Sequence, residues 1–151
     1  MIPHIIRHKD IFSKPLFTGA EDIKGKVLLL HSEQGYGDSI QFIRFLPQIK
    51  EKFGCKIAVK CREGLKELFQ TMSEIDVIAD RNEATPQFDY QLSIMSMPFV
   101  LGMKSINDLP KQIPYLKSTP YKELEIKKEK GKINIGILFF EKIRDLFFRN
   151  V

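Results

Sequence analysis

The stretch that decides the fold is Lys26-Val27-Leu28-Leu29-Leu30-His31, in which a short continuous apolar run stands between two polar residues. Such a run is typical of a β-strand that is buried on both faces of a parallel sheet. A glycine-containing loop follows at 32–37, and a helical pattern follows at 38–54, where apolar residues recur at helical spacing. This order of strand, loop and helix predicts a β–α unit.

The same alternation continues along the chain. We predict strands at 56–61, 76–79, 88–93 and 133–138, a helix at 63–72, an apolar turn or short helix at 97–103 and a short helix at 105–109. Strands that alternate with helices are joined by right-handed crossovers, so the pattern predicts an α/β fold with a parallel sheet. Pro47 lies inside the helical pattern at 38–54 and predicts a kink, because proline lacks a backbone donor.

Three segments are expected along the 151 residues. Residues 1–24 show little periodicity and contain Pro3, Pro15 and Gly19, which predicts a lead-in segment. Residues 25–138 form the predicted domain. Residues 139–151 carry apolar side chains at helical spacing with charged residues between them, which predicts an amphipathic helix. That helix is expected to pack on the chain's own sheet or to dock on a partner or a membrane surface.

Composition narrows the classes of function. The formal net charge of +5 permits anionic partners without demanding them, and we predict no nucleic-acid partner. Cys55 and Cys61 form neither a CxxC pair nor a zinc pattern, so we expect buried thiols in a reducing cytoplasm. Charged residues at positions 7, 9 and 10 argue against a signal peptide, and no apolar run approaches the roughly 18 residues of a transmembrane segment.

Candidate ligand-binding residues lie at 31–38, because ligands of parallel α/β sheets gather at the carboxyl ends of the strands. Gly35 and Gly37 are expected to let the backbone turn tightly and come close to a ligand. No third glycine follows at the dinucleotide spacing, and there is no Gly-Lys-Ser/Thr step of a P-loop. The pattern therefore predicts a ligand loop without naming its ligand.

Asp38 has two compatible interpretations. With Gln41 three residues later it resembles a capping box with Asp38 at the N-cap, and a carboxylate fixed there also suits a general base. His31 is either a buried histidine at a strand end or a polar group that faces the site. His4 and His8 are four residues apart, but no carboxylate or third ligand accompanies them, so we predict no metal site.

The residues also resemble a known family. Pro15-Leu16-Phe17-x-Gly19, followed by Gly25-Lys26-x-Leu28-Leu29-x-His31-x-Glu33-Gln34-Gly35-x-Gly37-Asp38-x-Ile40-Gln41-Phe42-x-Arg44-Phe45-x-Pro47, is similar to the start of the glycosyltransferase domain in bacterial tetratricopeptide-repeat proteins related to heptosyltransferases, glycosyltransferase family 9. Pro86-x-Phe88-Asp89, Ser93-Ile94-Met95-Ser96-Met97-Pro98 and Ile113-Pro114-Tyr115-Leu116 resemble later blocks of that family in the same order.

The resemblance implies half of a GT-B fold, namely one Rossmann-like three-layer sandwich with a mostly parallel sheet on the acceptor side of a cleft. It implies that Asp38 is the general base, which removes the acceptor's hydroxyl proton as that oxygen attacks the sugar's anomeric carbon with inversion. The substrate-binding residues that we expect around it are His31, Gln34, Gly35, Tyr36, Gly37, Ser39 and Gln41.

The implied partners are a nucleotide-sugar donor and a sugar or protein acceptor, with no cofactor and no metal. The family continues after its Ile-Gly-Ile strand into a tryptophan-glycine loop and a donor-binding domain, whereas here 135–137 leads into Leu138-Phe139-Phe140, and the sequence holds no tryptophan. We therefore expect transfer to need a separate donor-binding domain. The alternatives are a non-catalytic remnant that acts as an interaction module, with two chains paired through helix 139–151, and a flavodoxin-like protein that binds a small ligand or phosphate.

Overall fold

The computed structural model describes residues 13–33, 35–117 and Lys130. The chain divides into two compact units at 1–119 and 120–151, and every element described below belongs to the first unit. The strand predicted at 133–138 and the helix predicted at 139–151 lie outside the described residues, as do His4, His8 and Gln34.

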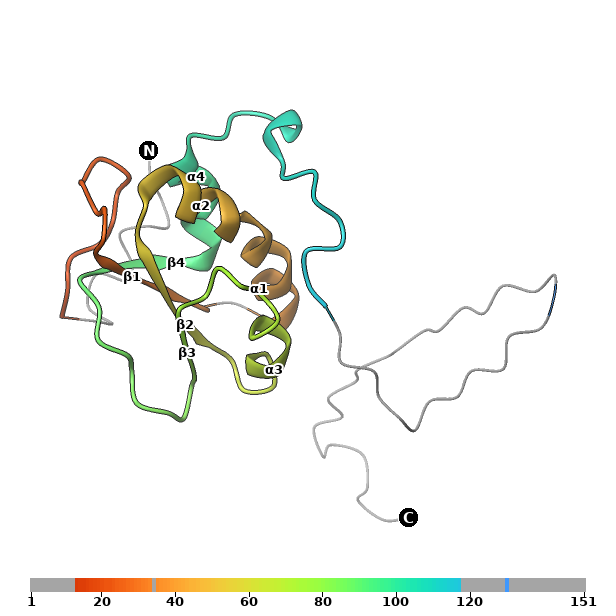
Figure 1. The fold of residues 1–151 in the computed structure, drawn as a ribbon, viewed down its shortest axis with the longest axis horizontal. Coiled ribbons are helices and arrows are strands. Elements are labelled where there is room, and N and C mark those ends of the chain that lie inside the picture. The colour runs from red at the N-terminus through yellow and green to blue at the C-terminus, as the bar shows by residue number, and fades with distance from the viewer. Residues whose placement is uncertain (1–12, 34, 118–129, 131–151) are drawn as a thin grey trace, which may run out of the picture. The chain divides into compact units, whose positions relative to one another are not determined.

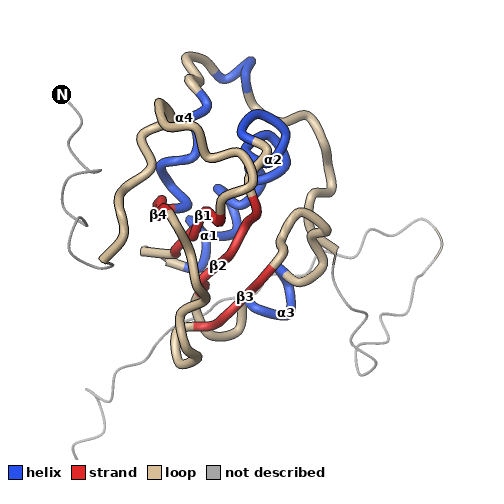
Figure 2. Tube along the Cα trace, turned by 60° about the vertical axis from the view of Figure 1, so that its left-hand side comes forward, coloured by secondary structure: helices blue, strands red, loops and turns tan. Residues whose placement is uncertain are grey.

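The centre of the first unit is a four-stranded parallel sheet (Figures 1 and 2). Its strands are β1 (Val27–His31), β2 (Lys56–Cys61), β3 (Val77–Asp80) and β4 (Tyr90–Ser93), and they lie in the order β3-β2-β1-β4. β1 pairs with both β2 and β4, so that His31 stands opposite Lys60 on one side and Ser93 on the other. The predicted α/β fold with a parallel sheet is confirmed, and the apolar run that suggested it lies inside the sheet.

The helical region after β1 is divided into three pieces. α1 (Tyr36–Phe42) is followed by a 3₁₀ turn, η2 (Ile43–Phe45), and then by α2 (Leu46–Phe53), which ends at Gly54 in the left-handed conformation. The predicted single helix is therefore interrupted, and the interruption is the 3₁₀ turn directly before α2. Pro47 stands in the first turn of α2, where proline is favoured because its missing N–H is not needed within that helix.

Other helices are shorter than their patterns suggested. The helix predicted at 63–72 is reduced to α3 (Lys66–Phe69) between turns. The apolar segment after β4 forms a 3₁₀ turn, η3 (Ile94–Ser96), and α4 (Met97–Leu101), while the segment predicted at 105–109 is the 3₁₀ turn η4 (Ile106–Asp108). The strands deviate from their predicted bounds by at most two residues.

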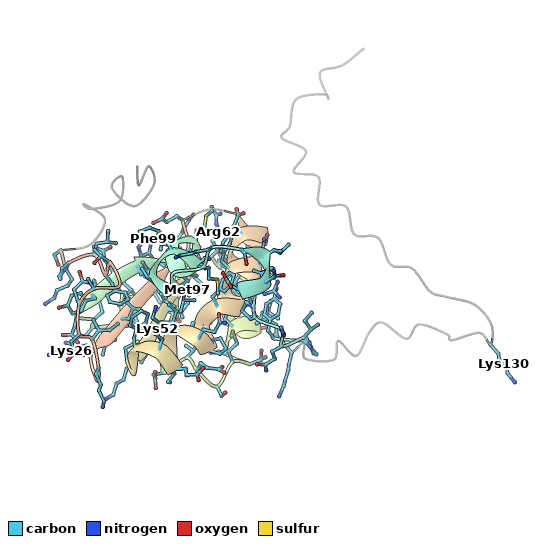
Figure 3. All side chains as sticks on the ribbon, turned by 90° about the horizontal axis from the view of Figure 1, so that it is seen from above. Lys26, Lys52, Arg62, Met97, Phe99 and Lys130 are labelled. Atoms are coloured by element: carbon cyan, nitrogen blue, oxygen red, sulfur yellow. The ribbon has the colours of Figure 1, made fainter. Side chains whose placement is uncertain are left out.

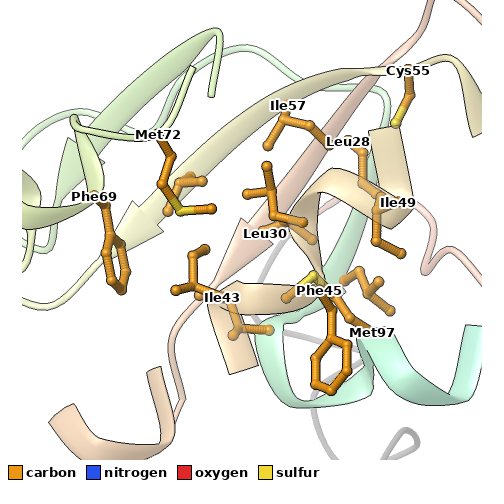
Figure 4. Close-up of a cluster of buried hydrophobic side chains, with 14 of the residues drawn as sticks. Leu28, Leu30, Ile43, Phe45, Ile49, Cys55, Ile57, Phe69, Met72 and Met97 are labelled. Atoms are coloured by element: carbon orange, nitrogen blue, oxygen red, sulfur yellow. The ribbon is translucent and has the colours of Figure 1, made fainter. Parts of the chain in front are cut away.

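One face of the sheet carries the main hydrophobic core (Figure 4). Side chains at alternate strand positions point to this face, and they pack against apolar residues of η2, α2, α3 and α4. The fully buried members from the strands and the helices are Leu28, Leu30, Ile57, Val59, Leu92, Ile43, Leu46, Ile49, Phe69 and Met97. This packing holds α1 and α2 against β1. It therefore fixes the position of the loop that connects β1 to α1.

The opposite face is buried as well. By register it carries Leu29, Ala58, Ala79 and Gln91, all of which are buried although none belongs to the main core. The connection 81–89 must pass β2 and β1 to reach β4, and Lys60 on this face donates a hydrogen bond from Nζ to the carbonyl of Glu83. Both faces of β1 are therefore covered, as its apolar run requires.

Part of the predicted lead-in belongs to this fold. Leu16 forms a parallel bridge to Gln91 of β4, and Phe17 N–H donates to the Gln91 carbonyl at 2.8 Å. The Phe17 side chain is fully buried, and its ring meets that of Phe53 edge-on at 4.9 Å. The folded core thus extends N-terminal of Gly25.

Candidate functional site

The carboxyl end of β1 lies between two other strand ends, because β2 and β4 run parallel to it on either side. The chain leaves β1 through Ser32, whose N–H donates to the Lys60 carbonyl at 3.0 Å, and enters α1 at Tyr36. The packing of α1 against η3 places the start of α1 and the end of β4 at the same edge. Of the predicted set, only Gln34 lies outside the described residues.

Asp38 stands in the first turn of α1. Its Oδ2 accepts a hydrogen bond from Gly35 N–H at 3.1 Å, and Gly35, with extended backbone at ψ 176°, is the N-cap. Asp38 was predicted as the N-cap itself, with Gln41 as its capping partner. The structure corrects this by three residues: Asp38 is the residue that reaches back to the cap, and Gln41 lies exposed on α1.

The Asp38 carboxylate keeps one free oxygen. Oδ1 has no hydrogen-bond partner among the described residues, and no described cation lies within ion-pair distance of the carboxylate. The side chain is partly exposed at the edge of the sheet. Asp38 therefore has one oxygen that fixes its position and a second that is open to a ligand hydroxyl.

Gly35 and Gly37 are not required by the backbone conformation, and the position of Gly37 has room for a side chain. Neither has a positive φ, and a Cβ placed on Gly37 would meet no atom within 4 Å. The expected tight glycine turn is thus absent, because the first helical turn begins directly at Tyr36. Ser39 is buried, and both its N–H and its hydroxyl donate to the Gly35 carbonyl, at 3.2 and 3.1 Å. Ser39 therefore stabilises the first turn of α1 from its buried side. It is not exposed at the surface where a substrate would bind.

Of the two interpretations of His31, the structure supports a buried histidine at the end of β1. Its side chain is 6% exposed, and Nδ1 lies 3.4 Å from Oε1 of Glu33, which is itself largely buried. The pair holds the end of β1 to the loop that follows it. Glu33 lies in the predicted loop 31–38 but was not among the expected substrate-binding residues, because its role depends on the way the chain bends after the strand.

Two hydroxyl groups at the strand ends have no hydrogen-bond partner within the described part of the chain. Ser93 is only 8% exposed and occupies the N-cap position of η3, yet its Oγ makes no capping bond. Ser32 Oγ, just beyond β1, is buried and also lacks a hydrogen-bond partner. An unpaired buried hydroxyl costs about 1–3 kcal/mol, so both serines lower the stability of the fold at this edge. Only the parallel pairing of β1 and β4 brings these serines, 61 positions apart in the sequence, to one edge.

The outer border of the site is aromatic and basic. The Tyr36 side chain is 51% exposed, and the guanidinium of Arg62, just after β2, lies 5.6 Å from the centre of its ring. Figure 3 labels Arg62 among the side chains of the domain. Arg62 was not predicted as a site residue, since nothing in its own sequence neighbourhood marks it. Its position follows from the parallel β1–β2 pairing.

The described residues hold no group of three or more histidine, cysteine or acidic side chains that is arranged for a metal ion. Cys55 and Cys61 are buried free thiols, and burial raises the pKa of Cys61 to about 11, so neither resembles an activated nucleophile. No helix within the described part of the chain is long and apolar enough to cross a bilayer. Searches of protein-family models, curated proteins and solved structures return no match to this chain.

Proposed function

We propose that this chain is the acceptor-side domain of a glycosyltransferase-like protein and that Asp38 is the general base of an inverting sugar transfer. The observation that carries the proposal is the Asp38 carboxylate, fixed through Oδ2 at the carboxyl edge of the sheet with Oδ1 unpartnered. An acceptor hydroxyl bonded to Oδ1 would pass its proton to Asp38. Its oxygen would attack the anomeric carbon of the donor sugar, and the nucleoside diphosphate would leave.

The surroundings of Asp38 suit an acceptor that carries many hydroxyl groups. Ser32 and Ser93 each hold a buried Oγ at this edge that has no hydrogen-bond partner among the described residues, and it could reach an acceptor if the side chain turned. The exposed ring of Tyr36 offers a flat apolar surface, and apolar surface with a few placed polar groups is what small-molecule sites share. A saccharide, or a sugar attached to a protein, matches this combination.

The proposal assigns the donor to another domain. The described residues supply a base and acceptor contacts, whereas stabilisation of the leaving diphosphate requires donors placed across the cleft. The nucleotide-sugar would therefore be held by a domain that faces the β1 edge. Two buried, unpaired thiols agree with a reducing compartment, and we propose the cytoplasm as the site of the reaction.

The test is Asp38→Asn, measured as turnover of a nucleotide-sugar by the chain together with its donor-binding domain. Removal of a general base lowers kcat by about 10²–10⁴-fold, and that loss is expected here. Asp108→Asn is the matched control, because Asp108 also reaches back from the third position of a helical turn, to Ser105 N–H at 3.0 Å, but at η4. Full turnover by the Asp38 variant would contradict the assignment.

The two alternatives remain predictions with distinct outcomes. The interaction module depends on helix 139–151, which lies outside the described residues. It would show as self-association of the full chain that is lost when 139–151 is deleted. A protein that only binds a small ligand would show saturable binding at the β1 edge and no transfer in the presence of any donor domain.

A further inference from the structure

A segment far from Asp38 in the sequence contacts the helix that carries Asp38. This segment, residues 110–117, follows η4 and is called the strap below. Its Tyr115 donates the hydroxyl hydrogen to the Ile40 carbonyl at 3.1 Å. Ile40 stands two residues after Asp38 on α1, so the strap binds the same short helix that holds the candidate base.

The Ile40 carbonyl lies at the end of α1, where carbonyl groups lack a partner inside the helix. The backbone hydrogen bond that closes α1 runs from Ile43 N–H to the Ser39 carbonyl, and the chain then tightens into η2. The Tyr115 hydroxyl therefore supplies a hydrogen bond that α1 cannot make for itself.

The packing of α1 against the core is limited. The helix is seven residues long, and only Ser39 among them is buried, while Ile40 and Phe42 are partly buried against the core. Isolated helices of this length are unstable in water, so α1 depends on its contacts with the rest of the domain. The loss of a single hydrogen bond should therefore change how readily α1 opens.

Arg44 of η2 fixes the Tyr115 ring. Its guanidinium lies 5.3 Å from the centre of that ring, and its Nη2 donates to the Pro110 carbonyl at 3.0 Å. The other end of the strap is fastened separately, because Lys117 N–H donates to Thr71 Oγ1 at 3.2 Å. The strap is thus held at both ends, and the Tyr115 hydroxyl has a fixed direction.

We propose that Tyr115 is a positioning residue for Asp38 and that Arg44 holds Tyr115 in place for this role. The hydroxyl fixes the last turn of α1, and the hydrogen bonds of the helix carry this constraint to the first turn. There the Asp38 carboxylate accepts from Gly35 N–H at 3.1 Å. The consequence for catalysis rests on the proposed function of Asp38 as a base, whereas the effect on the position of its carboxylate does not.

The test is amide hydrogen exchange of the full chain, measured by NMR for the natural protein and for Tyr115→Phe, which keeps the ring and loses the hydroxyl. Gly35 N–H is the reporter, because its partner is the Asp38 carboxylate. We expect this amide and those of 39–43 to exchange about fivefold faster in the variant, the factor that one hydrogen bond supplies. Unchanged exchange at Gly35 would overturn the proposal.

Asp76→Asn is the matched control for a general loss of stability. Asp76 bonds to Ile57 N–H of β2 and to Lys50 of α2, and it contacts neither α1 nor the strap through these bonds. Its substitution should weaken the fold by a similar amount and leave the exchange of Gly35 as it is in the natural protein. Equal acceleration of Gly35 in both variants would mean that Tyr115 has only a structural role, which would refute the proposal.

Kinetics separate this inference from the proposed function. With the donor-binding domain present, Tyr115→Phe should lower kcat about fivefold, leave KM nearly unchanged, and cause no further loss in the Asp38→Asn background. A loss that persists in that background would show that Tyr115 does not act through Asp38. Full turnover by Asp38→Asn alone would refute the proposed base, yet it would not alter the exchange measured at Gly35.

Arg44→Lys provides a second variant if Tyr115→Phe fails to fold. Lysine keeps the charge but lacks the planar guanidinium that lies on the Tyr115 ring and bonds to Pro110. Faster exchange at Gly35 is expected here as well. Tyr90→Phe is its control, since that ring packs on Phe17 and its hydroxyl has no hydrogen-bond partner among the described residues. Exchange at Gly35 that is the same in Arg44→Lys and Tyr90→Phe would contradict the role of the strap.

Discussion

Asp76 joins three elements through one carboxylate oxygen. Its Oδ2 accepts from Ile57 N–H of β2 at 2.7 Å and from the Lys50 ammonium of α2 at 2.9 Å, one residue before β3 begins. Burial acts to raise the pKa of Asp76, but the hydrogen bond from Ile57 and the charge of Lys50 outweigh it, so the pKa is lowered. The ionised form is thus the one that stabilises the fold.

We expect Asp76→Asn to lower the free energy of unfolding at neutral pH by about 1 kcal/mol, a modest value because the pair is partly exposed. Since the pKa is depressed by folding, the stabilisation is complete above the unfolded value of about 4 and is lost as the pH falls through the lower folded value. Urea unfolding of both proteins at a series of pH values checks this. A difference that grows with acidification would contradict it.

The cysteines provide a second prediction for single residues. Burial raises the pKa of both thiols. The Cys61 Sγ also lies 3.7 Å from the carbonyl oxygen of Ala79. Neither should react with iodoacetamide at about pH 8 until the domain unfolds, because the thiolate is the nucleophile. Mass spectrometry of the native and the urea-treated chain measures this, and rapid alkylation of the native protein would contradict the burial.

At the scale of elements, Gly54 and Gly37 should respond in opposite ways to substitution by alanine. Gly54 ends α2 with a φ of +59°, whereas Gly37 lies inside α1 with open space around it. We expect Gly54→Ala to destabilise the domain by about 1 kcal/mol, because a side chain is strained in the left-handed region. Gly37→Ala should stabilise it by roughly 0.5 kcal/mol through helix propensity. Equal effects in urea denaturation would show that the α2 ending is not as described.

The strands were predicted better than the helices, for a physical reason. A fully buried strand can be recognised in a sequence as an uninterrupted apolar run, and the run at 27–30 lies inside β1. Helical spacing of apolar residues, by contrast, persists through a 3₁₀ turn, so the division of 36–53 at η2 left no trace in the pattern.

The sequence predicted only those residues of the candidate site that lie next to one another in the chain. The loop and Asp38 follow directly from the β1–α1 order, and the capping role of Asp38 was correct in kind, although its position was three residues off. Arg62 and Ser93 were missed as site residues, and Glu33 was predicted only as part of the loop 31–38, because strand pairing and the bend after β1 decide their places. Signals of this kind appear only once the strand order is known.

At the scale of the whole molecule, the segment before β1 is part of the core. Phe17 is fully buried between β4 and the end of α2, whereas Phe99 on α4 is 51% exposed. Phe17→Ala should cost roughly 3–5 kcal/mol of unfolding free energy, and Phe99→Ala should cost far less. Urea unfolding of the two variants compares the same change at both sites. A small loss for Phe17→Ala would mean that residues 13–24 are dispensable for the fold.

The molecule as a whole is proposed to offer an acceptor and a base to a donor-binding domain. The most direct measurement is kcat for sugar transfer by the natural chain and by Asp38→Asn, each with that domain. A general base at Asp38 predicts that the variant is about 10²–10⁴-fold slower, because no carboxylate is left to take the acceptor's proton. Turnover by Asp38→Asn at the rate of the natural chain would show that another group is the base.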